Sequence, residues 1–168
     1  MLFRSNTDYT VKYTDNINAG TATVTVEGIG IYAGTTTTTF KINPKQISQT
    51  QNQAVTAVKY NGQAQTPELA LTDSASGTAV TLVEGKDYTV EYLNNTNVGN
   101  GIIKFTGMGN YTGEKSVNFQ ITAKDISTAE DIVVEDIPSV TYNGTGQIPD
   151  VVVKDGDKVL ELNKDYVI

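Results

Sequence analysis

The residues that come closest to a metal site are Asp155, Gly156 and Asp157, with Asp150 nearby. Carboxylate oxygens at this spacing are ligands that calcium accepts. The stretch lacks the length and the closing glutamate of an EF-hand loop, however, and its charged string lies between two apolar runs. That pattern is typical of a hairpin turn. We therefore expect a turn here, and the sequence leaves a weak calcium site at Asp155 and Asp157 open.

A glycine-rich stretch at residues 28–34 superficially resembles a dinucleotide-binding loop. Its spacing differs from that fingerprint, which also needs a helix to follow and hold the pyrophosphate. A threonine-rich strand pattern follows instead. We predict a turn with glycines at positive φ and with Tyr32 pinned across the corner.

The chain contains no histidine, cysteine or tryptophan. This composition removes the imidazole base, the thiol nucleophile, the disulfide and the usual zinc ligands together. The acidic residues are scattered, with no obvious cleft for a pair of glycosidase carboxylates. Asp8, Asp87 and Asp165 each precede a tyrosine and are expected to cap turns. We therefore predict that the chain is not an enzyme, and that it has no catalytic residues and binds no cofactor or metal.

The net charge is −7, from 19 acidic and 12 basic residues. Binding to nucleic acid usually needs a basic patch that neutralises phosphates, and we expect no nucleic-acid partner. Membrane insertion is not expected either, because no run approaches the ~20 apolar residues that cross a bilayer. Partners are expected to be proteins, or neutral sugars and wall polymers.

An internal repeat is the strongest signal in the sequence. Residues 8–48 align without a gap on residues 87–127, which lie 79 positions later, with 17 identities in 41 positions. The motif Asp8-Tyr9 returns as Asp87-Tyr88 and again as Asp165-Tyr166. The other half of the unit also recurs, because Tyr60-Asn61-Gly62 returns at residues 142–144. The chain is therefore a tandem array in which equivalent positions recur at an offset close to 79.

Apolar and polar residues alternate within each copy, as in Tyr9, Val11 and Tyr13. Strict alternation predicts half-buried strands, and β-branched residues suit them. Short strands with turn residues between them and no helical periodicity indicate an all-β fold of β-sandwich type. The strands of one unit are expected near 54–60, 67–72, 78–83, 87–93, 100–106 and 115–122.

All nine tyrosines occupy repeated positions. Since a residue renewed in every copy usually serves packing, we expect core and corner roles for them, with ligand contact as the alternative. A spontaneous lysine–asparagine crosslink would need a lysine on the apolar side of a strand. Lys12, Lys41 and Lys104 fall on the polar side, so no crosslink is expected.

The succession of motifs resembles a known group. Tyr-Asn-Gly is followed by Pro, then by Lys-Asp-Tyr-Thr-Val, Asn-Asn-Thr-Asn-Val-Gly, Gly-Met-Gly-Asn-Tyr-Thr-Gly and Phe-Gln-Ile. Nearly the whole chain is similar in this way to bacterial Ig-like repeats of the MBG/YDG kind. The resemblance implies tandem Ig-like β-sandwich modules in an extracellular cell-surface or secreted adhesin-like protein, and it carries over no catalytic residues.

The repeat predicts three parts. Residues 1–44 form the C-terminal half of a unit, 45–123 a complete unit, and 124–168 the N-terminal half of another. We expect a structural spacer whose partners are neighbouring repeats. The alternatives are a module that binds host protein or glycan, with the loop 73–78 as its best surface, and an accessory domain of a secreted glycoside hydrolase. Head-to-tail self-association through the two halves is a further hypothesis.

Overall fold

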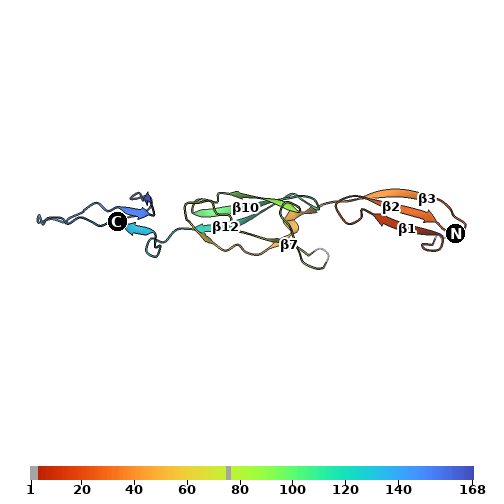
Figure 1. The fold of residues 1–168 in the computed structure, drawn as a ribbon, viewed down its shortest axis with the longest axis horizontal. Coiled ribbons are helices and arrows are strands. Elements are labelled where there is room, and N and C mark those ends of the chain that lie inside the picture. The colour runs from red at the N-terminus through yellow and green to blue at the C-terminus, as the bar shows by residue number, and fades with distance from the viewer. Residues whose placement is uncertain (1–3, 75–76) are drawn as a thin grey trace. The chain divides into compact units, whose positions relative to one another are not determined.

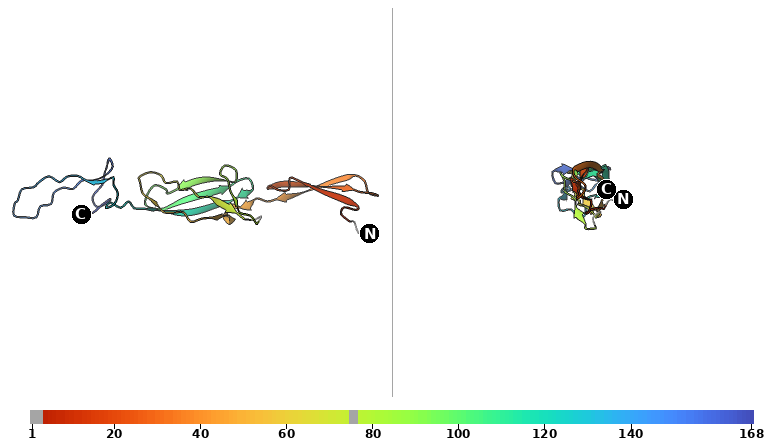
Figure 2. Two further views of the ribbon diagram at one scale, coloured as in Figure 1. Left: turned by 60° about the horizontal axis from the view of Figure 1, so that its bottom comes forward. Right: turned by 90° about the vertical axis from the view of Figure 1, so that its right-hand side faces the viewer.

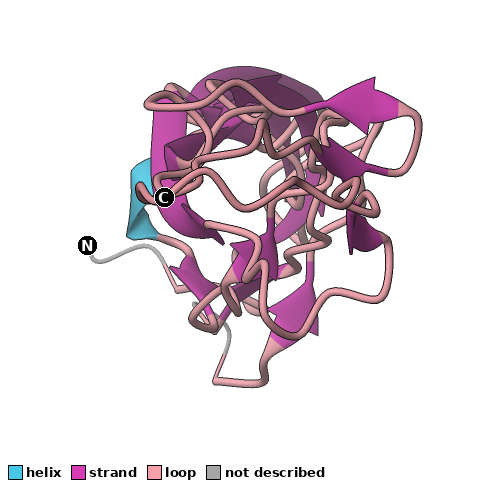
Figure 3. Cartoon of the chain, turned by 90° about the vertical axis from the view of Figure 1, so that its left-hand side faces the viewer, coloured by secondary structure: helices cyan, strands magenta, loops and turns pink. Residues whose placement is uncertain are grey.

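The computed structural model describes residues 4–74 and 77–168, and this part of the chain is nearly all β (Figure 3). Its helical content is a single 3₁₀ turn, η1 (Ile47–Gln49). No helix within these ranges is long and apolar enough to cross a membrane. Of the loop 73–78, residues 75–76 lie outside the described residues. The chain divides into two compact units, Met1–Thr122 and Ala123–Ile168.

The first unit begins with a three-stranded antiparallel sheet in the order β1-β2-β3 (Figure 1). Its strands are β1 (Tyr9–Thr14), β2 (Gly20–Gly28) and β3 (Thr35–Ile42). One face of this sheet carries Val24 and Val26, which are only half-buried, and Phe40, whose side chain is 42% exposed. The threonines of β3 are exposed on both faces, so no layer formed by the described residues covers the face that carries Val24 and Val26.

The rest of the first unit contains three further groups of strands (Figures 1 and 2). A four-stranded sheet has the order β6-β12-β10-β9, and a three-stranded sheet has the order β5-β7-β8. The short strands β4 and β11 form a parallel pair. The bounds are β4 (Lys45–Gln46), β5 (Gln51–Asn52), β6 (Val58–Lys59), β7 (Leu71–Asp73), β8 (Val80–Thr81), β9 (Tyr88–Leu93), β10 (Gly99–Gly107), β11 (Tyr111–Thr112) and β12 (Glu114–Thr122).

A hydrophobic core lies between the four-stranded sheet and the opposing strands and turn. The alternating positions Gly101, Ile103 and Phe105 of β10 are buried, as expected for a strand with one face inward. The opposite side of the core comes from η1, β7 and the residues that follow β8. The fully or nearly fully buried members of the cluster are Ile47, Leu71, Leu82, Tyr88, Ile103, Phe105, Phe119 and Ile121.

The first sheet and the β9–β12 segment have the same strand register. Tyr9 pairs with Gly28 as Tyr88 pairs with Gly107, and Gly20 pairs with Ile42 as Gly99 pairs with Ile121. Glycine is required at the end of β10, because a Cβ on Gly107 would lie 2.7 Å from the backbone nitrogen of Thr112. The same backbone approach occurs at Gly28.

The second unit is a small antiparallel sheet in the order β13-β14-β15. Its strands are β13 (Ile132–Val134), β14 (Val153–Asp155) and β15 (Lys158–Val159). Val153 is its one buried apolar side chain, with 4% exposed. A turn with Gly156 at φ 56° joins β14 to β15, so the predicted hairpin turn is confirmed.

The strand predictions are confirmed most closely where the alternation is long. β9, β10 and β12 lie within about a residue of the expected ranges. The ranges 54–60, 67–72 and 78–83 were less accurate, because only Val58–Lys59, residues from Leu71 onward and Val80–Thr81 form ladders there. Pro67 lacks the N–H that a ladder needs, and it lies outside β7.

Candidate functional site

The repeated Asp-Tyr motif is a backbone corner held by its aspartate. At the second occurrence the Val83 N–H donates to Asp87 Oδ2 at 2.9 Å, and the Asp87 N–H donates to the Val83 carbonyl at 2.8 Å. The Arg4 and Glu161 N–H groups donate to Asp8 and Asp165 at the same 2.9 Å. The prediction that these three aspartates cap turns is therefore confirmed.

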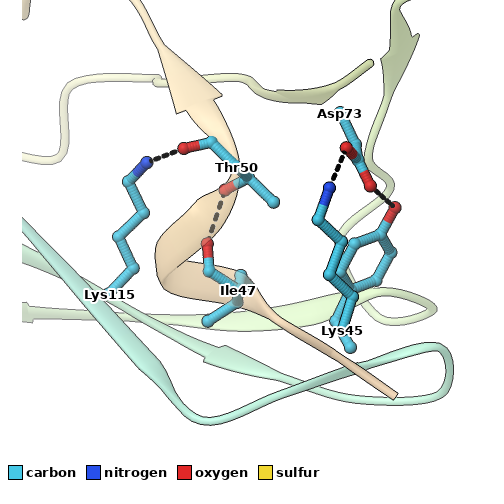
Figure 4. A network of polar contacts seen from close by, with 6 residues as sticks. Lys45, Ile47, Thr50, Asp73 and Lys115 are labelled. Atoms are coloured by element: carbon cyan, nitrogen blue, oxygen red, sulfur yellow. Dashed lines mark hydrogen bonds and ion pairs between the residues drawn. The ribbon is translucent and has the colours of Figure 1, made fainter. Parts of the chain in front are cut away.

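A lysine, an aspartate and a tyrosine form a partly buried polar cluster in the first unit (Figure 4). Lys45 Nζ lies 2.5 Å from Asp73 Oδ1, and the Tyr111 hydroxyl donates to Asp73 Oδ2 at 3.1 Å. The Asp73 side chain is only 11% exposed. These residues come from β4, β7 and β11, so the Asp73 carboxylate links its own strand, β7, to both β4 and β11.

Burial and the neighbouring carboxylate both act on the phenol of Tyr111. Burial disfavours its charged form most strongly, and the hydrogen bond to Asp73 adds to the effect, so the pKa of Tyr111 rises to about 12. At neutral pH the phenol is protonated, as a free phenol also would be, and its hydrogen bond to Asp73 links β11 to β7.

A second set of polar contacts fixes the turn η1 against β12 (Figure 4). The Thr50 hydroxyl donates to the Ile47 carbonyl at 2.7 Å, and Lys115 Nζ donates to the Thr50 carbonyl. Burial lowers the pKa of Lys115, because the charged ammonium loses hydration there. These contacts hold Ile47 in the core, where its side chain is fully buried.

The second unit contains a related cluster of one lysine and two aspartates. Lys124 Nζ lies 2.5 Å from both Asp131 Oδ2 and Asp155 Oδ1. These contacts raise the pKa of Lys124, with Asp131 as the larger cause, and they lower the pKa of Asp131. Asp155 is therefore occupied by an ammonium group. No group of three or more acidic residues that could hold a metal ion occurs in residues 4–74 and 77–168.

The glycine-rich stretch 28–34 is a turn, as predicted. Gly30 and Gly34 have φ of 69° and 94°, and the Gly28 N–H donates to the Gly34 carbonyl at 3.0 Å. The Tyr32 N–H donates to the Ile29 carbonyl at 3.2 Å across the corner. Beside this turn is an open pocket of about 380 Å³, lined by Asp8, Tyr9, Val26, Gly28 and residues 32–36.

The tyrosines follow the prediction in one copy and depart from it elsewhere. Tyr88 is buried in the core with its ring 5.3 Å from that of Phe105, edge to face, and Tyr60, Tyr92 and Tyr111 pack around the core. Tyr13 and Tyr142 are 53% and 89% exposed, so the expectation of a core or corner role was wrong for these two. Tyr13 lies in β1, whereas Tyr142 lies in the loop between β13 and β14.

Sequence reasoning missed the cluster of Lys45, Asp73 and Tyr111. It considered only lysines inside long alternating strands, and of these Lys104 does face outward, in an ion pair with Glu114 at 2.8 Å. A signal did exist, because Lys45 recurs as Lys124 and the partner Asp73 recurs as Asp155. Their offsets of 79 and 82 differ, since the intervening loop changes length, and this obscures the pairing.

Comparison with protein-family models, with curated proteins and with solved structures found no match to this chain.

Proposed function

We propose that this chain is a non-catalytic spacer built from tandem Ig-like modules of the MBG/YDG kind, within a bacterial cell-surface or secreted adhesin-like protein. The observation that supports the proposal is that the same hydrogen-bonded turns and the same strand register occur twice in the chain. The hydrogen bond that closes the glycine turn is 3.0 Å from Gly28 to Gly34 and 2.9 Å from Gly107 to Gly113. The aspartate corner and the strand register recur with it. Repeated construction of this kind is typical of extended arrays.

The lysine, aspartate and tyrosine side chains that could do chemistry also support a structural role, because they bond to one another. Lys45 and Asp73 neutralise each other, Tyr111 donates a hydrogen bond to Asp73, and Lys124 is shared between two carboxylates. Each of these groups connects strands of its own unit. A nucleophile or base would instead need a substrate-facing position with a matched partner.

The joint after β3 has features that favour a stiff connection. The Asn110 side chain accepts from the Ala19 N–H at 2.7 Å and donates to Asn18 Oδ1 at 2.9 Å, which joins two turns that lie far apart in sequence. Pro44 fixes its own φ and precedes the paired strand β4. A spacer needs such restraints, because a free joint would let consecutive modules fold back on one another.

Nuclear spin relaxation on the full chain tests this proposal. We expect the amides of β1–β3 and of β9–β12 to report one common rotational correlation time in this chain. Asn110→Ala combined with Pro44→Gly should separate the two values, because it removes both the bridge and the fixed φ. The matched control is Asn118→Ala, an exposed asparagine in the middle of β12.

Independent tumbling of the two sheets in this chain would contradict the spacer proposal. Saturable binding of a wall polysaccharide or a host glycoprotein, lost on changing residues of an inter-strand loop, would favour the binding-module alternative instead. The relaxation result needs no knowledge of a ligand, because that measurement concerns the chain alone.

A further inference from the structure

The complete copy shows how the apolar face of such a sheet is covered. β4 pairs in parallel with β11, so that Gln46 is opposite Thr112, and Ile47 follows directly into the core. The Gln46 side chain lies over Gly113, where an added Cβ would collide with its Oε1. The turn that follows β10 thus fixes the positions of three consecutive residues, Lys45, Gln46 and Ile47.

The first sheet carries the same receiving surface, and no segment of residues 4–74 and 77–168 pairs there as β4 pairs with β11. The pocket beside β2 is lined by residues that lie 79 positions before Asp87, Tyr88, Phe105, Gly107 and residues 111–115. Of those later residues, Tyr111, Thr112 and Gly113 contact Lys45 and Gln46, and Tyr88 and Phe105 share the core with Ile47. A Cβ on Gly34, the counterpart of Gly113, would meet no atom within 4 Å. The pocket of about 380 Å³ therefore corresponds to the binding site that the β4–η1 segment occupies in residues 45–123.

The second unit presents a segment of the matching sequence. Lys124-Asp125-Ile126-Ser127 corresponds to Lys45-Gln46-Ile47-Ser48 at an offset of 79. Ile126 is 52% exposed, whereas Ile47 is fully buried. Lys124 already holds Asp155, as Lys45 holds Asp73, so the segment is attached to β14 in the arrangement that the complete copy uses.

We propose that residues 124–127 of one molecule bind in the pocket at Gly28–Thr36 of a second copy of this chain. Residues 124–125 add a parallel strand at positions 32–33 of the second copy, and Ile126 enters the apolar face beside Val24 and Val26. Binding buries an exposed isoleucine and covers a sheet face that is only half-buried, and both terms favour association. The contact is heterologous, so repeated use produces rings or open chains of molecules.

Disulfide trapping tests the register, because the chain has no cysteine of its own. Ala33 and Asp125 are the counterparts of Thr112 and Gln46, which are Cα partners in the parallel pair. Neighbouring strands place such partners within the Cα distance that a disulfide spans. Mixing full-length Ala33→Cys with full-length Asp125→Cys under mild oxidation should give a mixed dimer in excess of either self-linked dimer.

Val133→Cys provides the matched control. Val133 is 53% exposed, like Ile126, but it corresponds to Gln51, which is exposed in the complete copy. Mixed with Ala33→Cys it should give only the background of random collisions. If the Ala33→Cys and Asp125→Cys pair gave no more mixed dimer than this control, the proposal would be wrong.

Light scattering of the untagged chain over a wide concentration range gives the second readout. The average mass should rise with concentration, and Ile126→Asp should weaken association by about tenfold or more, since an isoleucine buried at an interface is worth at least that factor. Val133→Asp should leave association unchanged. A constant monomeric mass together with equal behaviour of the two variants would overturn the proposal, whatever the role of the parent protein.

Discussion

At the scale of single residues, Asp73 links two partners that lie far from it in the sequence. Its two oxygens are divided between Lys45 and Tyr111, and it is nearly buried. A buried carboxylate is tolerated only with such partners, because an unpaired charge would be expelled into water or protonated. The loss of either partner therefore exposes the protein to a desolvation cost that the intact cluster avoids.

Tyr111→Phe should lower the free energy of unfolding at neutral pH by about 1–2 kcal/mol, because it removes a hydrogen bond to a charged acceptor. The pKa of Tyr111 is about 12 when folded and 10.0 as a free phenol. Its contribution to stability is therefore complete below pH 10 and is lost between pH 10 and pH 12. Urea unfolding across this range checks the effect.

The matched control for that experiment is Tyr142→Phe, since Tyr142 is 89% exposed. It should leave both the stability and its alkaline dependence unchanged. Spectroscopic titration of the phenols adds a second readout, in which Tyr111→Phe removes a group that ionises near pH 12. Equal alkaline profiles for the two variants would contradict the role given to Tyr111.

The corner aspartates could be predicted from the sequence, whereas the Asp73 cluster could not. Asp87 acts on a backbone group four residues away, so its role is encoded in a local motif that recurs three times. Asp73 acts on Lys45 and Tyr111, which lie 28 and 38 residues away in sequence. Contacts of that range depend on how the sheets face each other, which alternation within a strand does not specify.

At the scale of elements, β10 and β12 pack closely where a glycine on β10 faces an aromatic ring on β12. A Cβ on Gly101 would lie against Cζ of Phe119, far inside contact distance, so the ring occupies the space that a side chain would need. Both residues are buried, with Phe119 only 2% exposed. In the first sheet the corresponding residues are Ala22 and Phe40, and there the ring is turned out to 42% exposure.

Gly101→Ala should therefore lower the free energy of unfolding by about 1–3 kcal/mol, the usual cost of overpacking a well-filled core. The ring of Phe119 must move to make room, and it cannot do so without disturbing Ile103 beside it. Thermal or urea unfolding measures the change. Asn100→Ala, at the exposed neighbouring position of the same strand, is the control and should stay within about 0.5 kcal/mol. A stable Gly101→Ala variant would contradict the close contact.

The alternation of residues predicted β9, β10 and β12 because each has one face in the core and one in water. It failed at 54–60, where the apolar residues contact the core without forming a continuous ladder. Val55 and Val58 pack against the core, although only Val58 and Lys59 are paired with another strand. Burial alone produces the same apolar pattern as a paired strand, so the sequence does not distinguish the two.

At the scale of the whole molecule, two sheets of the same register differ in whether they are covered. We expect hydrogen exchange to reflect this difference. At concentrations at which the chain is monomeric, central amides of β10 should exchange slowly, because opening them disrupts the core. Those of β2 should exchange at least about tenfold faster, since local opening exposes little further apolar surface.

The comparison uses equivalent positions, such as Ile103 and Val24, so intrinsic exchange rates differ little. Raising the protein concentration should slow β2 selectively if molecules associate as proposed. Equal protection of both sheets in the dilute monomer would mean that the first sheet is stable without a covering layer, and the energetic argument for association would fail.

The placement of β12 has a mechanical consequence. Lys45 lies at the end of the module where β12 begins, because β4 pairs with Tyr111 and Thr112, just before that strand. Thr122 lies at its other end, about 25 Å away for a strand of this length. Tension applied through the chain would therefore run along the strands and load the β10–β12 hydrogen bonds in shear, all at once. A hairpin pulled open from one end would instead lose them in succession.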